Sequence, residues 1–391
     1  MSGRVRRFAK TRSDAVSIIE SALNTKDAVY WLHGASVGEI DQALAIAREL
    51  RHRNYRAKIL ITAFSLSVQR LPKDDCDYCC YLPLDFPWAW NFMKPKPNLT
   101  FITFTWDIYP NLLRRIRQAG GRSFLCSAAL PADSWRIRYA RWVRSSYQDL
   151  TGIGVVDEPN KRHFKALAAS HTQIEVTGDS RYDTIFFKLE QASLSSNDAQ
   201  KLKKAQPLFI LASTYKQCDD QLFPHLRQWL VDNQNFDVWI FPHHVDDSRI
   251  KECQTGLEEH GIDFQLYSKQ KDPGRVVLVD QIGLLANVYA RAVYAYVGGG
   301  FHHRIHNTAE PAALGAVVLT GPHIETSPIA LQLEEQGTLF RRNDGADLFD
   351  VLTMLAANDD KRNELSKKNR QYLKEERGAA GRFIDTFLPP P

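Results

Sequence analysis

Short apolar segments alternate with amphipathic segments along the chain, and this alternation limits the possible folds more than any other feature. Six strand-like segments occupy the first half, at residues 28–33, 57–63, 99–104, 122–127, 152–156 and 174–178. They are apolar without a two-residue alternation, which is typical of strands covered on both faces in a parallel sheet. Segments with helical periodicity, such as Ile40–His52 and Asn111–Ala119, lie between them. The pattern predicts a doubly wound α/β domain.

A second series of strands follows a polar segment that contains none. The later strand-like segments are residues 208–213, 237–241, 263–267, 276–280, 293–299 and 316–320, and a charged helical stretch, Asp359–Phe387, ends the series. We therefore expect two Rossmann-like domains facing a central cleft, with ligands at the carboxyl ends of the strands. The predicted boundaries are an N-terminal domain at 1–188, a linker at 189–207, a C-terminal domain at 208–372, and a C-terminal helix and tail at 373–391.

The net charge of +5 is concentrated at the N-terminus, in Arg4, Arg6, Arg7, Lys10 and Arg12. The other 45 basic residues equal the 45 acidic residues in number, which argues against a nucleic-acid-binding protein. The basic arm is interpreted either as a solvated terminus or as a contact with anionic headgroups. No segment approaches the ~18 consecutive apolar residues of a membrane-spanning helix, and no secretory signal is present. We expect a cytoplasmic protein.

Three of the six cysteines, Cys76, Cys79 and Cys80, have the spacing of half a zinc site. No second Cys-x-x-Cys completes it, and the one His-x-x-His motif, from His303 to His306, is more than two hundred residues away. The run YCCYL around Cys79 and Cys80 is typical of a buried strand. We expect structural cysteines and no metal.

The first motif with chemical potential is WLHGASVGE, residues 31–39. A strand ends near His33, glycines loosen the turn, and a helix begins around Glu39. A part-buried carboxylate at this place can accept a proton from an attacking hydroxyl. The alternative is that Glu39 only complements the dipole of its helix.

The second motif is YVGGGFHHRIHNTAEPAALGAVVLTGP, residues 296–322. Three glycines followed by a helix start near Asn307 predict a phosphate-binding loop. Glu310, in the first turn of that helix, is suited to accept both hydroxyls of a ribose. The histidines of the loop lack a fourth ligand and the pattern of a metalloprotease, which argues against a metal site.

The chain resembles the 3-deoxy-D-manno-octulosonic acid (Kdo) transferase family of lipopolysaccharide and lipid A biosynthesis. Besides the two motifs above, the matching segments are YLPLDFP (81–87), WDIYPNLL (106–113), VTGDSRYD (176–183), LASTY (211–215) and FPHH (241–244), all in family order. The resemblance covers roughly residues 28–340. It implies a type B glycosyltransferase with an acceptor-binding N-terminal domain and a nucleotide-sugar-binding C-terminal domain.

The resemblance also implies a reaction and its residues. Kdo would pass with inversion from CMP-Kdo to a lipid A precursor, with Glu39 as general base and no metal or other cofactor. The donor-binding residues would be Ser213, Thr214, His244, Gly299, Gly300, His306, Asn307 and Glu310. Contacts to the acceptor or to the Kdo carboxylate would be Ser36, Gly38, Arg70 and Asp107. The protein would lie peripherally at the inner face of the cell inner membrane, with no nucleic-acid partner.

Several positions depart from the family pattern. The family's Glu-Thr-Glu is Thr105-Trp106-Asp107 here, its Asn-Ala-Arg-Leu-Ser has become residues 127–131 without the arginine, and its Arg-His-Pro-Glu-Arg has become residues 243–247 with no arginine. Two alternatives therefore stay open: a related glycosyltransferase with another nucleotide sugar or acceptor, and a degenerate, non-catalytic paralogue that binds nucleotide or lipid.

Two aromatic segments are further candidates for a lipid-facing surface. One contains Trp88, Trp90 and Phe92, for which core packing is the competing interpretation. The other combines two tryptophans with four arginines between residues 135 and 144, and its competing interpretation is a solvated helix face.

Overall fold

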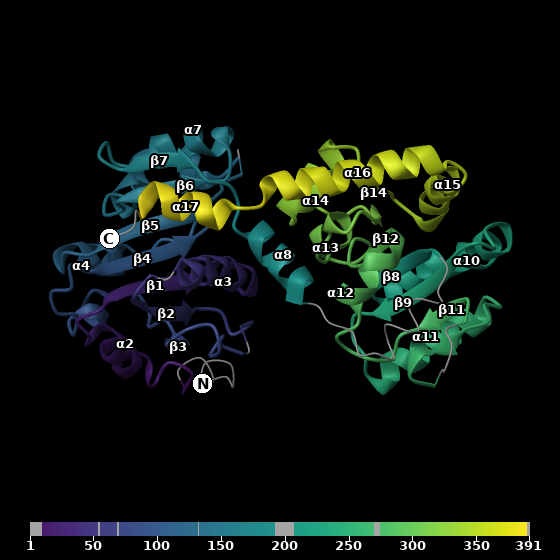
Figure 1. The fold of residues 1–391 in the computed structure, drawn as a ribbon, viewed down its shortest axis with the longest axis horizontal. Coiled ribbons are helices and arrows are strands. Elements are labelled where there is room, and N and C mark those ends of the chain that lie inside the picture. The colour runs from purple at the N-terminus through teal and green to yellow at the C-terminus, as the bar shows by residue number, and fades with distance from the viewer. Residues whose placement is uncertain are drawn as a thin grey trace. The chain divides into compact units, whose positions relative to one another are not determined.

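The computed structural model describes residues 10–388 apart from positions 54, 69, 132, 192–206 and 270–273. This part of the chain divides into two compact units (Figure 1). The first contains the residues up to Thr184 together with those from Glu376 onward, and the second is Ile185–Glu375. Most of the linker predicted at 189–207, and three arginines of the basic arm (Arg4, Arg6 and Arg7), lie outside the described residues.

The first unit is built around a parallel sheet of seven strands, in the order β3-β2-β1-β4-β5-β6-β7. The strands are β1 (Ala28–Gly34), β2 (Ala57–Ala63), β3 (Tyr78–Tyr81), β4 (Leu99–Phe104), β5 (Arg122–Ala128), β6 (Gly152–Val155) and β7 (Gln173–Val176). The helices are α2 (Ala15–Leu23), α3 (Val37–His52), α4 (Pro110–Gln118), α5 (Trp135–Arg138), α6 (Ala140–Val143), α7 (Glu158–Leu167), α8 (Arg181–Gln191) and α17 (Ala379–Phe387), with short 3-10 turns at Pro87–Trp90 and Arg144–Ser146. The strands predicted in this half of the chain, including the YCCYL strand, are confirmed.

The sheet has a hydrophobic core on each face, as its uninterrupted apolar strands predict. In β1, Val29 and Trp31 are buried in one core, while Tyr30 and Leu32 are buried in the other. All six residues of β4 are buried. Both faces of each strand are therefore apolar because each face packs against a hydrophobic core, and this is why the strands show no two-residue alternation in the sequence.

The second unit repeats this architecture with the strand order β10-β11-β9-β8-β12-β13-β14. Its strands are β8 (Leu208–Thr214), β9 (Asp237–Pro242), β10 (Gln265–Leu266), β11 (Val276–Leu278), β12 (Ala292–Val297), β13 (Val317–Thr320) and β14 (Leu339–Arg341). Its helices are α10 (Lys216–Asp232), α11 (Asp247–Glu259), α12 (Leu285–Val288), α13 (Ala309–Ala313), α14 (Pro328–Glu335), α15 (Gly345–Ala356) and α16 (Asp359–Glu376), with 3-10 turns at Tyr267–Lys269 and Tyr289–Arg291. Strand β14 was not predicted, because three residues at a sheet edge give too short an apolar run.

The last helix belongs to the first unit although it follows the whole second unit in sequence. The predicted helical stretch 359–387 is interrupted at Gly378, whose φ of +90° favours glycine. Beyond it, Phe383 and Phe387 are buried against Phe124 of β5. The Asp183 carboxylate accepts the main-chain N–H groups of Gly378 and Ala380 at 2.5 and 2.8 Å, which fixes the start of α17.

Arg12, a member of the predicted basic arm, is part of the folded first unit. Its Nε donates to the carbonyl of Leu82 at 2.8 Å, and its guanidinium lies 5.0 Å from the ring centroid of Phe64. Burial lowers the pKa of Arg12. This arginine therefore stabilises the loops after β2 and β3 rather than extending into solvent.

Candidate functional site

Each sheet has one point at which the chain reverses its direction of strand addition. In the first unit, β1 lies between β2 and β4, so the loops after β1 and β4 lead away from each other. In the second unit, β8 lies in the same way between β9 and β12. Ligands of doubly wound folds bind outside the carboxyl ends of the strands at such points. Ligands are therefore expected at the ends of β1, β4, β8 and β12.

The loop after β1 carries Glu39, and its geometry depends on Gly34. A Cβ at Gly34 would lie 2.5 Å from the main-chain nitrogen of Ile40, so this tight turn requires glycine. The Oε2 atom of Glu39 accepts the N–H of Ser36 at 2.8 Å and its hydroxyl at 2.9 Å. Glu39 thus belongs to a capping box at the start of α3. Ser36 and Gly38 are exposed beside it, and a Cβ at Gly38 would meet no atom within 4 Å.

The carboxyl group of Glu39 is 9% exposed, and its environment favours the neutral form. Burial raises the pKa of Glu39 above its usual value. The hydrogen bonds from Ser36 and the positive charge of Arg181 act in the opposite direction. A part-buried carboxylate with an elevated pKa that still ionises is suited to accept a proton, so the capping role and the chemical role coexist in one side chain.

A second carboxyl group, Asp107, lies at the neighbouring strand end. It follows β4, and its pKa is raised to about 7, first by burial and then by the negative charge of Glu39. Arg136 acts in the opposite direction. The two acids are therefore close enough to interact. Near pH 7 Asp107 is about half protonated.

A chain of buried polar groups lies beneath these two acids. The Nε2 atom of His33 is 2.8 Å from the Tyr109 hydroxyl, and its Nδ1 atom is 2.9 Å from the Thr62 hydroxyl. Burial lowers the pKa of His33 to about 3, so the imidazole is neutral. Burial and the charges of Asp107 and Glu39 raise the pKa of Tyr109. This network fixes the ring of Tyr109 next to the carboxyl pair.

Arg181 is the cation of this site that the sequence analysis missed. It forms an ion pair with Asp179 at 2.5 Å, and Asp179 in turn accepts a hydrogen bond from Gln42 at 2.9 Å. The charge of Arg181 lowers the pKa of Glu39. Arg70, which was predicted to meet the Kdo carboxylate, is exposed on the loop after β2. The VTGDSRYD motif contained the signal for Arg181, since it has an arginine two residues from an aspartate on either side, shortly after a strand.

Three strand ends at or next to the two switch points contain backbone strain. Thr105, Ser127 and Ser213 are the non-glycine residues of the described chain with positive φ, at +60°, +50° and +52°. They lie at the carboxyl ends of β4, β5 and β8. Strain of this kind costs on the order of 1–3 kcal/mol per residue and is concentrated at functional sites in proteins. The positions of these strained residues therefore support ligand binding at the two switch points.

The glycines after β12 allow their loop to approach β8 closely. A Cβ at Gly298 would lie 2.1 Å from the carbonyl oxygen of Ser213, and one at Gly299 would lie 2.1 Å from that of Arg304. Gly299 also has φ of +92°. The main-chain N–H groups of Gly299 and Gly300 have no hydrogen-bond partner among the described residues. Packing requires these glycines, and two main-chain donors stay open for an anion.

The predicted helix start near Asn307 is confirmed, but the helix is short. Helix α13 has five residues, and Asn307 precedes it with a side chain that accepts the N–H of Ala309 at 2.9 Å. The amide of Asn307 also donates to Glu310 at 3.0 Å, and Glu310 is half-buried. The pair thus lies together beside the glycine loop.

Ser213 and Thr214 differ in accessibility. Ser213 is half-buried at the strained end of β8, whereas Thr214 is fully buried. The Thr214 carbonyl and hydroxyl lie 3.3 and 3.4 Å from Arg249, which forms an ion pair with Asp219 at 2.5 Å. The hydroxyl of Thr214 therefore helps to hold α11 near β8.

Six aromatic and imidazole rings from three neighbouring strand ends gather at the second switch region. They are Tyr215 after β8, His243 and His244 after β9, and His302, His303 and His306 after β12. His244 and His306 were predicted as donor-binding residues. Tyr215 and His243 were not, and their only sequence signal was that they replace other residues at family motif positions.

The segment rich in tryptophan and arginine after β5 is largely exposed. Trp142 is 83% exposed, and no residue of α5 or α6 is buried. Arg136 lies near Asp107, and Arg144 donates to the carbonyl of Ala168 at 3.1 Å. Arg138 and Arg141 are exposed and make no hydrogen bond within the described residues. In the other aromatic segment Trp90 is buried, as core packing predicts, while Trp88 is exposed.

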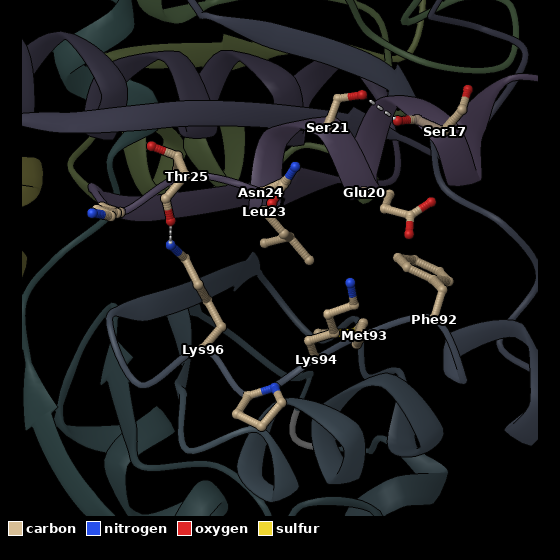
Figure 2. A pocket seen from close by; sticks show the side chains of 12 residues that line it. Ser17, Glu20, Ser21, Leu23, Asn24, Thr25, Phe92, Met93, Lys94 and Lys96 are labelled. Carbon is tan, nitrogen blue, oxygen red and sulfur yellow. Dashed lines mark hydrogen bonds between the residues drawn. The ribbon is translucent and has the colours of Figure 1, made fainter.

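A cavity of about 710 Å³ in the first unit lies away from Glu39. It is lined by α2 and by residues 92–96, including Phe92 and Lys94 (Figure 2). Lys96 donates to the carbonyl of Thr25, which fixes one wall just before β1. The cavity therefore lies at the amino ends of the strands, opposite the edge that carries the carboxyl pair.

Among the residues that the structure describes, no group of three or more His, Cys, Asp or Glu side chains is arranged to hold a metal ion. Cys80 is buried in the core, and Cys76 and Cys79 are half-buried.

None of the described helices combines the length and the apolar character needed to span a membrane.

Comparison with known proteins identifies relatives of this chain. Residues 5–184 match the family model of 3-deoxy-D-manno-octulosonic-acid transferases. The 3-deoxy-D-manno-octulosonic acid transferase of Haemophilus influenzae is 26% identical over 92% of this chain and 86% of its own length. The enzyme of the same name from Chlamydophila psittaci is 27% identical over 92% of this chain and 84% of its own length.

Solved structures show the same fold at lower identity. The UDP-GlcNAc 2-epimerase of Neisseria meningitidis superposes with a TM-score of 0.65 and 13% identity, covering 92% of this chain and 99% of that one. Acinetobacter baumannii MurG superposes with a TM-score of 0.55 and 14% identity over the same shares of the two chains. With the two seven-stranded parallel sheets, these likenesses show that the chain has the glycosyltransferase type B fold. In sequence the chain is similar to the 3-deoxy-D-manno-octulosonic acid transferase family, through the family model over residues 5–184 and through curated relatives over 92% of its length.

Proposed function

We propose that this glycosyltransferase transfers Kdo with inversion from CMP-Kdo to a lipid A precursor, and that Glu39 is its general base. The observation that carries the proposal is the carboxyl pair at the first switch point. Burial raises the pKa of both carboxyl groups, that of Asp107 to about 7. One proton acceptor and one proton donor are thus available at the same strand edge, where the fold binds ligands.

The proposed reaction uses the pair as follows. An acceptor hydroxyl attacks the anomeric carbon of Kdo, and the bond from that carbon to the phosphate oxygen of CMP breaks. The hydroxyl proton passes to the carboxylate of Glu39. Protonated Asp107 donates a hydrogen bond to the acceptor, and Ser36 and Gly38 leave the approach to Glu39 open because both are exposed.

The donor is proposed to bind to the second unit. The open N–H groups of Gly299 and Gly300 and the imidazoles of His244 and His306 would receive the phosphate. Glu310, next to Asn307, would accept the ribose hydroxyls. Ser213 completes this set at the end of β8, with Thr214 supporting it from below. Main-chain and imidazole donors meet the leaving charge, so we expect no metal requirement.

We further propose that the protein works in the cytoplasm at the inner face of the membrane that contains the acceptor. The supporting observation is the exposed segment with Trp135, Tyr139 and Trp142 beside Arg138 and Arg141. Tryptophan and tyrosine favour the membrane interface, and each nearby cation contributes ~1 kcal/mol at an anionic surface.

Membrane binding can be measured by co-sedimentation with vesicles of anionic phospholipid. The double variant Arg141→Gln/Trp142→Ser is expected to bind at least about tenfold more weakly, because it removes one cation and one interfacial ring. The control, Arg227→Gln/Val231→Ser, also removes an exposed arginine and an exposed apolar side chain, from α10 of the second unit. Equal losses in both variants would show that the segment after β5 is not a specific surface.

The proposed reaction is tested with freshly generated CMP-Kdo and tetra-acylated lipid A precursor, in the presence of EDTA, with mass spectrometry of the lipid. We expect a product heavier by at least one Kdo unit. A product that appears only when a divalent metal replaces EDTA would reject the metal-free donor site. Absence of product under both conditions, with CMP still bound in calorimetry, would indicate a different sugar or acceptor.

A further inference from the structure

The rings at the second switch region form one stack around Tyr215. The ring of Tyr215 is parallel to those of His302 and His306, with centroids 4.9 and 5.5 Å away. His243 stacks on His306 at 4.3 Å and contacts Tyr215 at 4.7 Å. The hydroxyl of Tyr215 lies 3.2 Å from Nε2 of His306. Three strand ends, those of β9, β8 and β12, thus contribute to one cluster.

Most of the hydrogen-bonding capacity of this cluster is unused. Within the described residues, the ring nitrogens of His243, His244 and His302 form no hydrogen bond, and His306 uses one nitrogen on Tyr215. The open main-chain N–H groups of Gly299 and Gly300 belong to the loop that carries His302 and His306. A set of donors at the carboxyl edge of a parallel sheet is suited to an anion.

The environment of His243 and His306 favours their neutral forms in the free protein. Burial and the neighbours His243, Arg304 and His244 lower the pKa of His306 to about 4. Burial and His244 lower the pKa of His243. Two imidazoles 4.3 Å apart cannot both be protonated cheaply, because like charges repel and one ring is part-buried. The charged or titratable groups around the stack are Arg304, His303, Lys216, Cys218, Asp219, Asp246 and Arg249.

An anion bound to the ring nitrogens would instead favour the protonated form of an imidazole. Its negative charge favours the protonated form of a nearby imidazole, and each proton added to the cluster creates a charge-assisted hydrogen bond to the anion. A dianionic phosphate accepts hydrogen bonds only, so a neutral imidazole can offer it one N–H and a protonated imidazole two. Binding and protonation are therefore coupled.

We propose that the Tyr215–His243–His306 stack binds the phosphate of the nucleotide, and that it takes up one proton from solution when it holds the dianionic phosphate of released CMP. The inference rests on the proposed function, since it assigns this anion site to the donor. It adds Tyr215 and His243 to the residues that contact the donor. The protonated imidazole that holds the leaving nucleotide would then exist only while the phosphate is bound.

The test is calorimetry of CMP binding to the full chain between pH 7.2 and 8.5, where the phosphate is already dianionic. Titrations in buffers of different ionisation enthalpy report the number of protons taken up. We expect about one proton per CMP and a Kd that rises by up to about tenfold per pH unit. Cytidine, which lacks the phosphate, is expected to bind without proton uptake.

Two variants locate the proton. His243→Arg supplies a permanent cation, so its CMP binding is expected to lose proton uptake and to become independent of pH. His306→Gln should lower CMP affinity and abolish proton uptake. His260→Gln is the matched control, because this imidazole of the same unit caps α11 by bonding to the carbonyl of Gly256.

The outcomes separate this inference from the proposed function. If the unmodified protein binds CMP without proton uptake, or if both variants keep it, the inference is wrong while Kdo transfer can still be observed. If CMP does not bind at any pH, the inference is wrong, and the transfer assay decides the function independently. Loss of proton uptake in His260→Gln would also contradict it.

Discussion

Replacing Glu39 by glutamine is expected to lower the rate of Kdo transfer by about 10²–10⁴-fold, the usual contribution of a general base. Glutamine is the informative substitution because Glu39 also closes the capping box of α3 through Ser36. A glutamine carbonyl can accept the same N–H, since both residues occur at this position of capping boxes. Alanine would remove the base and the helix cap together. Initial rates of transfer measured by mass spectrometry give the result.

Two controls accompany this variant. The midpoint of thermal unfolding should change little, because the helix cap is kept, and CMP affinity should be unchanged, because Glu39 belongs to the first unit. A variant with normal stability and normal transfer would show that Glu39 is a helix cap alone. Loss of CMP binding would instead place Glu39 in the donor site.

Replacing Asp107 by asparagine is expected to stabilise the protein at alkaline pH. The pKa of Asp107 is raised to about 7, so the folded state holds its proton more tightly than the unfolded chain does. This stabilisation is complete below the unfolded pKa of about 4 and is lost as pH rises to 7. The unmodified protein should therefore lose stability over this window, and Asp107→Asn should remove that loss. At ~1.4 kcal/mol per pKa unit, the variant should be more stable by about 2–4 kcal/mol at pH 8 and nearly unchanged at pH 4.

Activity should change in a different way from stability. If protonated Asp107 donates to the acceptor, transfer by the unmodified protein should decline above about pH 7, as that proton is lost. The asparagine side chain is a neutral donor at every pH, so the variant should lose this alkaline decline. Urea unfolding at pH 4, 6 and 8 and a pH–rate profile measure the two effects. A stability difference that does not depend on pH would contradict the raised pKa of Asp107.

The fold could be predicted from the sequence because the information is local. Each strand of a parallel sheet with two covered faces is an uninterrupted apolar run, and twelve such runs were assigned before the structure, with YCCYL as a further one. The failures were at places with little local signal. Strand β14 has three residues at a sheet edge, and the break at Gly378 interrupts an otherwise continuous charged helix.

The site could be predicted only where one motif contained it. Glu39 was found because its loop and helix start are contiguous in WLHGASVGE. Arg181 was missed because it lies at the start of α8, far from Glu39 in the sequence, and is brought near it only by folding. Arg70 was chosen only for its place after β2. Tyr215 and His243 follow different strands, so the sequence around each residue gave no sign that their rings are in contact. Contacts between side chains at the edge of a sheet can be predicted only when the order of the strands is known.

Helix α17 has a consequence for how the protein is made. When synthesis of the second unit is finished, the first unit still lacks α17, which packs on α3 and covers β5. The glycines of β6 depend on it too, because Phe383 and Phe387 fill the space beside Gly154 and Gly152. The first unit can therefore complete its fold only after the whole second unit has been synthesised, because the residues up to Thr184 pack with residues from Glu376 onward.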